Sequence, residues 1–547
     1  MLGKSFYEYV VVRMCVVLLQ HPVAFYIAGL ATCLIGGNFG RSRACWGTAT
    51  FIVLSLMSIE SAYALFIWRP YTKRLKEPAR HPALSSTAER RALFDRCMAT
   101  IPSFDHYLCM WFLGAELSEI RRDNIREFLL WAFFDVELRS NKDKHTSRDY
   151  EDYSTEVDQY IAHIEFLWGR PFESGRGRAK CLRLTIDSIE TKYRTVWWYA
   201  IVALLDIVTH VLLSLKGFEY YAQPPEKSIF PPRIQQLFAS RRSPAESLSY
   251  WHRHHQSDGL PVVFFHGIGL GLWPYVRFLG EISATGNGRG QTGIIAIEVL
   301  PICFRLTDPP LDKEAFLRQL KGILHYHTWE RFTLVSHSYG SILSTHAIKC
   351  PEFETRIPAV VLIDPVSILL HLPDVAYNFT RRQPKTAIEL LLWYFASTDP
   401  GVAHCLGRYF FWRENAIWAD ELTGRSISTG FGGSRHSKPR QVAICLAAFD
   451  LIIDSHSIAR YLAEGDRENC LVCLQGKQAE CEVAGPQAAR IQGMDHKQAR
   501  FVGSDIDVLW FHDKDHGQVF QSQRERKKIV AVIRDYCKVN EISSMSN

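Results

Sequence analysis

Residues 332–348, FTLVSHSYGSILSTHAI, contain the serine best placed to do chemistry. The apolar run ends at Ser336, and Ser338 follows two residues before Gly340. A serine on a sharp strand-to-helix turn with small neighbours is typical of the nucleophile in G-x-S-x-G. Ser336 is small enough to replace the first glycine, and no such pattern surrounds Ser336 itself. We therefore expect Ser338 to be a nucleophile, with the backbone N–H of Tyr339 facing a developing oxyanion.

A glycine-rich loop upstream, FFHGIGLG at residues 264–271, strengthens this prediction. It follows a predicted strand, so the backbone N–H of Ile268 can lie opposite that of Tyr339 and complete an oxyanion hole. A phosphate-binding loop is the alternative interpretation. The segment contains no lysine and does not match G-x-G-x-x-G, which favours the oxyanion hole.

The general base is expected in LWFHDKDHGQVF, residues 509–520. His516 precedes Gly517 and an apolar helix start, where a loop histidine can reach Ser338, whereas His512 still lies on a strand. A metal site built from these histidines and the neighbouring aspartates is disfavoured, because the segment lacks helical periodicity. We therefore assign His516 as the base and expect neither a metal nor a cofactor.

An acid must hold the imidazole from the side away from Ser338, and the expected chain order is serine, acid, histidine. Asp364 and Asp450 end successive predicted strands, in VVLIDP and ICLAAFD. The strand that ends at Asp450 directly precedes the one leading to His516. We therefore expect Asp450 to be the acid and keep Asp364 as the alternative. Asp454 is expected to cap a helix.

Six short apolar runs must position these residues: 261–266, 293–299, 332–336, 358–364, 442–450 and 507–512. They are unbroken rather than alternating, which is typical of strands buried on both faces of a parallel sheet. Helix-like stretches between them predict an α/β class with a mostly parallel, doubly wound sheet. Residues 367–438 interrupt this rhythm with an aromatic-rich helical insertion, expected to be a lid. Residues 465–503 form a second, polar insertion.

The first 80 residues have a different character. Residues 14–37 and 46–68 are apolar, and the second stretch, whose one charge is Glu60, is long enough to span a bilayer. Basic residues follow it directly, at Arg69, Lys73, Arg74 and Lys76. The positive-inside rule then places the rest of the chain in the cytosol. We expect one or two membrane-spanning helices; a buried helical hairpin is the alternative.

A helical region is expected between this anchor and the sheet. Residues 111–135 carry apolar positions at helical spacing. Residues 195–215 are long enough to span a membrane, but Asp206 and His210 favour a core or membrane-surface helix. A proline-rich linker follows. The predicted organisation is an all-α membrane-anchor region at 1–80, a helical region and linker at 81–246, and an α/β domain at 247–547.

Composition excludes some classes of function. The chain has 547 residues, of which 47% are apolar and 22% charged, as in a folded protein. The net charge of +6, from 63 basic and 57 acidic residues, is mild for this length and does not favour nucleic-acid binding. The fourteen cysteines are scattered, and a chain of this size buries a core without disulfides. We expect mostly free thiols.

From about residue 247 to 537 the sequence resembles the α/β-hydrolase superfamily. The resemblance rests on strand-HGxG, strand-SHSYG-helix, the aspartates at strand ends and strand-DxxHG. Together with the N-terminal anchor, it is most similar to fungal membrane-associated serine α/β-hydrolases. The resemblance implies an eight-stranded, mostly parallel sheet, a helical lid after the sixth strand and a Ser–His–acid triad without cofactor. The missing first glycine and the insertion at 465–503 depart from the pattern.

The expected function is therefore a membrane-anchored serine hydrolase, of the carboxylic ester hydrolase type, that acts on a hydrophobic ester or lipid. Ser338 would attack, His516 would move the proton and Asp450 would orient His516. An acyltransferase, thioesterase or cyclising enzyme of secondary metabolism using the same triad is one alternative. A non-catalytic binding protein on the same scaffold is the other, because fold does not fix function.

Overall fold

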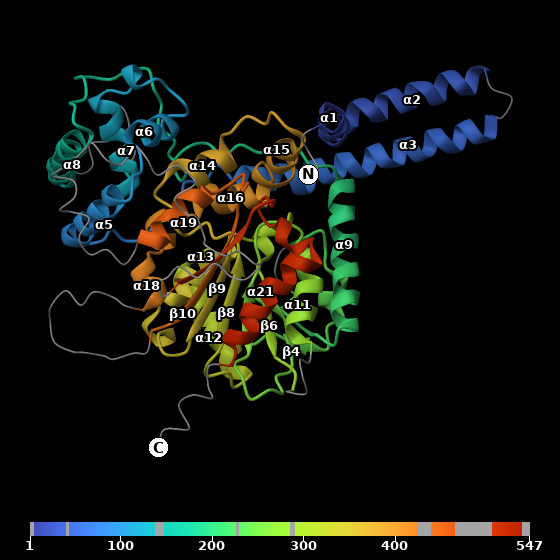
Figure 1. The fold of residues 1–547 in the computed structure, drawn as a ribbon. Helices are drawn as coiled ribbons and strands as arrows, with labels where there is room; N and C mark the ends of the chain where they lie inside the picture. Colours follow the sequence, from blue (N-terminus) through green and yellow to red (C-terminus); the bar gives the residue numbers. More distant parts are fainter. Residues whose placement is uncertain are drawn as a thin grey trace.

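A nine-stranded, mostly parallel sheet forms the centre of the protein (Figure 1). This computed structural model describes residues 5–39, 43–136, 147–225, 229–284, 290–424, 439–464 and 506–538. The strand order is β11-β10-β9-β8-β5-β6-β4-β1-β3, and β4 is antiparallel to both neighbours. The strands are β1 Glu219–Ala222, β3 Arg241–Arg242, β4 Ser249–Arg253, β5 Val262–Phe265, β6 Ile294–Glu298, β8 Thr333–His337, β9 Ala359–Ile363, β10 Gln441–Ala447 and β11 Ile506–Phe511. A separate pair joins β2 (Ile229–Phe230) to β7 (Leu306–Thr307).

All six predicted strands are present, as β5, β6, β8, β9, β10 and β11. Every residue of β5, β6, β8 and β9 is buried, which is why their sequences are unbroken apolar runs. The predicted α/β fold class is confirmed. The sheet also takes in β1 and β3, which lie before residue 247 and inside the predicted helical region and linker. Strands this short beside prolines leave no periodicity to detect.

Helices cover both faces of the sheet (Figure 1). One face packs against α9 (Val196–Leu215), α11 (Val276–Ser283) and α21 (Gln523–Tyr536) in a single apolar cluster. The other face packs against α12 (Lys313–Tyr326) and α13 (Gly340–Ile348). The second cluster continues into the lid and the helical region, so these three parts share one core.

The insertion between β9 and β10 is helical, as predicted. Its elements are α14 Pro373–Thr380, α15 Ala387–Leu391, the π-helical η6 Leu392–Ser397, α16 Pro400–Arg408, α17 Trp412–Asn415 and α18 Ala419–Thr423. Helix α19 (Ser455–Glu464) follows β10. The second predicted insertion, 465–503, lies outside the described residues.

The helical region contains α5 Thr87–Ala99, α6 Phe104–Trp111, α7 Arg122–Phe134 and α8 Ser147–Trp168. The periodic stretch 111–135 is not one helix. Leu113 and Gly114 have φ of 59° and 80°, so the chain leaves the right-handed helical conformation after α6 and re-enters it at Arg122. Apolar spacing predicts the buried face but does not detect this break.

The N-terminal helices are α1 Phe6–Gln20, α2 Pro22–Phe39, α3 Arg43–Tyr63, the π-helical η1 Ala64–Trp68 and α4 Arg69–Arg74. Helices α2 and α3 lie side by side and project from one end of the molecule (Figure 1). Among the described residues, Trp46–Arg74 and Val196–Leu215 are long and apolar enough to cross a membrane. The pair Phe6–Gln20 and Pro22–Gly36 also qualifies but is bent by 83°.

Candidate active site

The turn between β8 and α13 holds Ser338 in a strained conformation. Its φ is 52°, which is rare for a residue with a side chain. A Cβ on Gly340 would lie 2.4 Å from the carbonyl oxygen of Phe265, so only glycine fits there. Ser336 is fully buried and accepts a hydrogen bond from Ser344 at 2.8 Å. Ser336 thus occupies the position of the missing glycine as a small packed residue.

Three loops bring Ser338, His516 and Asp450 together. The His516 Nε2 lies 2.7 Å from Ser338 Oγ, and its Nδ1 lies 2.6 Å from Asp450 Oδ2. The Nδ1–H donates to the carboxylate, so Nε2 can accept the serine proton when the imidazole is neutral. The loops follow β8, β10 and β11, so all three groups meet at the carboxyl edge of the sheet.

The two candidate acids have different roles in the structure. Besides bonding His516, Asp450 accepts the N–H groups of Ile452 at 2.7 Å and Ile453 at 3.0 Å, which fixes its carboxylate. Asp364 has no hydrogen bond to His516 within the described residues. It accepts the N–H of Ala447 at 2.9 Å and that of Gly517 at 2.8 Å. It therefore braces the histidine loop against β10.

Asp454 is the N-cap of α19, as predicted. Its Oδ1 accepts the N–H groups of His456 and Ser457, both at 3.1 Å. A further aspartate, Asp515, accepts the N–H of His516 itself at 2.7 Å and that of Leu451 at 3.0 Å. Asp515 thus joins the histidine loop to the acid loop.

The charges around His516 favour its protonated form. Burial alone would lower its pKa, but the charge and hydrogen bond of Asp450, with smaller contributions from Asp364 and Asp515, raise the pKa to about 9. Burial, together with the charge of Asp450, raises the pKa of Asp364 to about 7. His337 packs beside His516, and burial lowers its pKa well below the usual value. His337 is therefore neutral.

Ile268 and Tyr339 line the same cavity as Ser338, as an oxyanion hole requires. Within the described residues neither backbone N–H has a hydrogen-bond partner. The preceding amide, of Gly267, donates to the Tyr275 hydroxyl at 3.1 Å. A Cβ on Gly267 would lie 2.8 Å from that of Ser338, so glycine allows this loop to approach the serine. The oxyanion role of the two amides stays a prediction.

Three of these groups lie close enough together to be candidate metal ligands. Asp364, Asp450 and His516 offer atoms that all lie within 4.8 Å of one another. Two ligands that each lie about 2.1 Å from one zinc ion would be more than 3 Å apart in tetrahedral geometry. The 2.6 Å contact between His516 and Asp450 is shorter than that, so this arrangement fits a hydrogen bond better than a shared ion.

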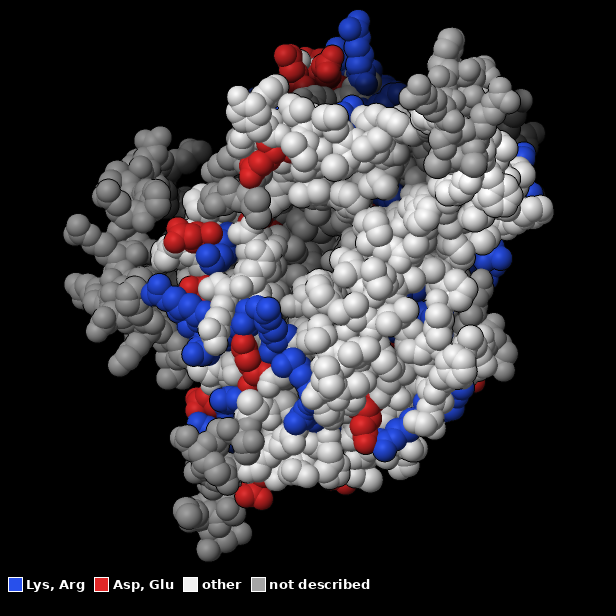
Figure 2. Space-filling model, turned by 90° about the vertical axis from the view of Figure 1, so that its right-hand side faces the viewer, with Lys and Arg blue, Asp and Glu red and all other residues white. Residues whose placement is uncertain are grey.

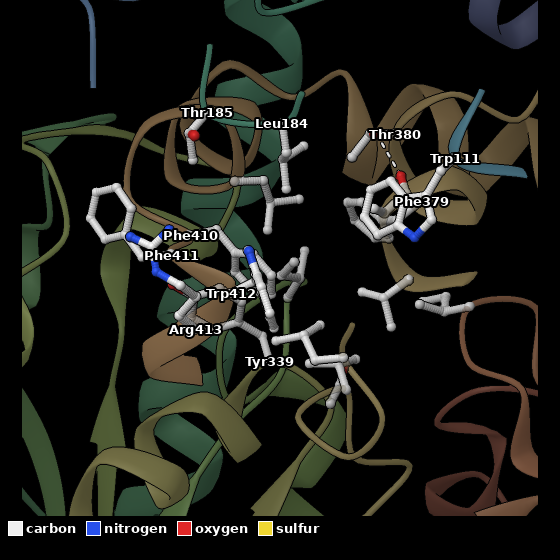
Figure 3. Close-up of a pocket in the computed structure, with 18 of the residues that line it drawn as sticks. Trp111, Leu184, Thr185, Tyr339, Phe379, Thr380, Phe410, Phe411, Trp412 and Arg413 are labelled. Carbon is white, nitrogen blue, oxygen red and sulfur yellow. Dashed lines mark hydrogen bonds between the residues drawn. The ribbon is translucent and has the colours of Figure 1, made fainter. Parts of the chain in front are cut away.

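An apolar cavity of about 50 Å³ lies above Ser338. Figure 3 shows Tyr339 at its lower end, Leu184 and Thr185 at its upper end and Trp111 beside Phe379 on one side. The lid contributes residues between Val366 and Arg413, and the helical region contributes the rest of the far wall. A larger cavity, of about 350 Å³, lies alongside it. Phe411 and Tyr339 line both cavities, so these two side chains form the partition.

Several lining residues are not predicted by the sequence. Trp111 and Trp131 come from the helical region, and an ion pair between Arg413 and Asp135 joins the lid to the end of α7. The Thr185 hydroxyl accepts from Trp131 Nε1 at 3.1 Å. Nothing local marks these residues, because they reach the site only through packing between segments far apart in the chain.

The positions of these groups along the sheet define the α/β-hydrolase fold. Apart from the two-residue edge strand β3, the sheet has eight strands, which are in chain order β1, β4, β5, β6, β8, β9, β10 and β11, and β5 and β6 exchange places within the sheet. In chain order, the turn with Ser338 follows the fifth strand, the lid the sixth, Asp450 the seventh and His516 the eighth. This is the Ser–acid–His order of that fold. The prediction of the superfamily's fold is confirmed, whereas the resemblance to fungal members stays a prediction.

Comparisons with known proteins add little to this. No protein-family model matches the chain, and no curated protein matches it. A membrane phospholipase A described as a bacterial virulence factor is similar at 12% identity and a TM-score of 0.34, over 62% of this chain and 93% of that one. Naproxen esterase from Bacillus subtilis is similar at 12% identity and a TM-score of 0.32, over 53% of this chain and 87% of that one. A thermophilic esterase from Thermogutta terrifontis is similar at 14% identity and a TM-score of 0.33, over 53% of this chain and 95% of that one. At these values the fold assignment rests on the sheet itself.

Proposed function

We propose that this protein is a membrane-associated serine hydrolase of hydrophobic esters. The observation that carries the proposal is the unbroken chain from Ser338 through His516 to Asp450, with contacts of 2.7 and 2.6 Å, beneath an apolar cavity. A fixed acid, an oriented imidazole and a strained serine are the parts that covalent acyl transfer requires.

The reaction follows from these positions. Ser338 Oγ attacks the acyl carbon while His516 Nε2 takes its proton, and the negative oxygen of the tetrahedral intermediate faces the N–H groups of Ile268 and Tyr339. The intermediate expels the alcohol, which receives the proton from His516. Water then attacks the acyl-serine, His516 takes one of its protons, and that proton returns to Ser338 as the acid leaves.

Substrate class and location follow from the surroundings. The cavity is walled by aromatic and aliphatic side chains, which favours an apolar ester or lipid. We place the anchor at residues 1–80, the helical region and linker at 81–246 and the hydrolase domain at 247–547, with the first strands of the sheet borrowed from the linker. The basic residues after the anchor favour a cytosolic hydrolase domain.

Labelling with a fluorophosphonate probe tests the proposal. The full-length protein should react, Ser338→Ala should not, and Ser336→Ala should still react. Ser336→Ala is the matched control, because it removes a hydroxyl two residues away. Loss of labelling in a folded Ser336→Ala together with retention in Ser338→Ala would refute the assigned nucleophile. No labelling of a folded wild-type protein would favour the non-catalytic alternative.

A panel of esters then tests the reaction class. Medium and long acyl esters should have higher kcat/KM than acetate esters, and release of free acid should continue when an alcohol acceptor is added. A preference for short, charged esters contradicts the substrate class. Product found wholly as a new ester would favour the acyltransferase alternative over hydrolysis.

A further inference from the structure

Helix α9 carries an exposed apolar stripe along its whole length. Its outward side chains are 39–78% exposed: Trp197, Ile201, Leu204, Ile207, Val211 and Leu215. No Lys, Arg, Asp or Glu within α9 is exposed. Figure 2 views the molecule from the side that carries α9 and shows a continuous surface area without charged side chains there. A patch of this length on a folded domain indicates a contact surface.

The opposite side of α9 is fixed to the hydrolase domain. Asp206 pairs with Arg233 at 2.9 Å and with Arg305 at 2.9 Å, and both arginines are buried. Leu213 is fully buried in the cluster beneath the sheet. To span a membrane, α9 would have to abandon these ion pairs. Arg233 would keep only Glu298, and the buried Arg305 would have no carboxylate partner among the described residues, which is strongly unfavourable. Although α9 is long enough to span, it therefore stays on the domain.

Helices α2 and α3 have the opposite character, because they project away from the domain beside the upper end of α9 (Figure 1). They are fastened to its first turn. Trp197 Nε1 donates to the hydroxyl of Tyr26 in α2 at 3.0 Å. The N–H of Val196 donates to the carboxylate of Glu60 in α3 at 3.3 Å. The hairpin therefore leaves the domain at the edge where the exposed stripe of α9 begins.

Helix α1 lies on the other side of this base. It is bent by 83° from α2, and Val16 packs against Leu390 and Tyr394 of the lid. Its outer side chains, among them Phe6, Tyr7, Val11 and Met14, are more than half exposed. Like α9, α1 runs across the direction of the hairpin and has one packed side, and its exposed side is mostly apolar but includes Arg13.

We propose that the bare sides of α1 and α9 lie on the surface of a lipid bilayer, and that within the N-terminal region only α2 and α3 enter its hydrocarbon. Helices with one apolar side lie in the bilayer interface, whereas apolar helices without a packed side insert. The exposed side chains of Arg69, Lys73 and Arg74, where the chain returns from α3, face anionic headgroups. Because α1 packs against the lid, the surface formed by α1 and α9 also holds the lid close to the membrane. This inference rests on the proposed membrane association but not on the hydrolase chemistry.

The test uses full-length protein in vesicles of phosphatidylcholine and phosphatidylserine that contain a phospholipid with a photoreactive diazirine in its acyl chain. After illumination and proteolysis, lipid adducts are mapped by mass spectrometry. Peptides of α1, α2, α3 and α9 should carry adducts, and peptides of α8 and α12 should not. In Leu204→Glu/Val211→Glu, labelling of α9 should fall about tenfold while labelling of the hairpin is kept, because charged side chains are disfavoured at the hydrocarbon boundary.

Phe166→Glu in α8 is the matched control, because Phe166 is 80% exposed on a helix far from α9. This substitution should leave the lipid labelling of α9 and of the hairpin unchanged. If both glutamate substitutions prevent folding, as judged by thermal unfolding, Leu204→Gln replaces them with the same expected direction. Adducts on the hairpin but none on α9 would overturn the proposal, and so would a dimer in detergent that Leu204→Glu dissociates. Absence of adducts everywhere would instead refute membrane association as a whole.

Discussion

At the scale of single residues, two carboxylates compete for one imidazole, and hydrogen bonding separates their roles. Asp450 contacts Nδ1 of His516 directly, whereas the two carboxylate oxygens of Asp364 accept hydrogen bonds from the backbone N–H groups of Ala447 and Gly517. Asp364 also has a φ of 43°, which ordinary residues avoid. The second carboxylate therefore acts on the histidine through the loop and through its charge.

Asparagine substitutions distinguish the two carboxylates. Asp450→Asn should lower kcat about 10³-fold or more, because it removes the charge that stabilises the imidazolium and favours the wrong tautomer. Asp364→Asn should keep most of kcat but cost about 1–3 kcal/mol of unfolding free energy, because one buried N–H loses its acceptor. Steady-state kinetics measures kcat for each variant, and thermal unfolding measures its stability. A folded but inactive Asp364→Asn beside an active Asp450→Asn would reverse the assignment.

The pH dependence of activity should follow His516. Asp450 and its neighbours raise the pKa of this imidazole to about 9, and the base works only when Nε2 is unprotonated. The kcat/KM should therefore rise with pH, reach half of its limiting value near pH 9 and level off above that. In Asp364→Asn the loss of a negative charge lowers the pKa of His516, so the rising limb should move to lower pH. A wild-type profile that is flat from pH 6 to 9 is incompatible with this.

At the scale of elements, we expect the lid to set the length of the acyl chain that the proposed ester substrate can carry. The cavity above Ser338 has a volume of about 50 Å³, whereas the neighbouring one has about 350 Å³. Phe411, just before α17, lies between them. In this conformation a long chain has room only if the partition moves.

Phe411→Ala should join the two cavities. The chain-length optimum should shift upward, and two additional buried methylenes, at about 0.8 kcal/mol each, should raise kcat/KM for the longer ester roughly tenfold over the wild type. Acetate esters should gain nothing, which provides the internal control. Trp273→Ala, at an exposed aromatic outside both cavities, is the matched variant. An unchanged chain-length profile in Phe411→Ala would mean that the larger cavity is not an acyl site.

The sequence predicts the strands and the turn but not the walls of the site. Ser338, Asp450 and His516 each end or follow a buried strand, and parallel strands end at one edge, so local patterns are enough to bring them together. Trp111 and Arg413 lie on helices whose spacing says only that one side is buried. Which segment covers that side is decided by packing between distant parts of the chain.

At the scale of the whole molecule, the hairpin and the α/β domain form one continuous structure. The sequence shows Glu60 as a single charge in an apolar stretch, which would be costly inside hydrocarbon. The structure gives it partners, because its carboxylate accepts the Tyr193 hydroxyl and the first N–H of α9. Glu60 is therefore located at the base of the hairpin rather than midway through a membrane.

Alkaline carbonate extraction tests the anchoring as a whole. The full-length protein should stay with the membrane pellet, because α2 is predominantly apolar and the helix that contains α3 is long and apolar enough to cross a membrane. A chain lacking residues 5–68 is not a suitable comparison, since Tyr63 and Trp68 pack against the core. Comparison with a known peripheral protein in the same preparation is the control. Release into the supernatant would contradict insertion.

Substitution of Glu60 tests how the hairpin is held. Glu60→Leu removes the acceptor of the Val196 N–H and of the Tyr193 hydroxyl and puts an apolar side chain of similar size in its place. A hydrogen bond to a charged group is worth about 1.5–3 kcal/mol, and 1.4 kcal/mol is a factor of ten in an equilibrium. Amide hydrogen exchange in the first turn of α9 should therefore accelerate about tenfold or more. Glu77→Leu, an exposed glutamate beyond α4, should leave it unchanged. Equal exchange in Glu60→Leu and the wild type would mean that Glu60 does not hold the first turn of α9, and that apolar contacts and the hydrogen bond from Trp197 to Tyr26 fasten the hairpin.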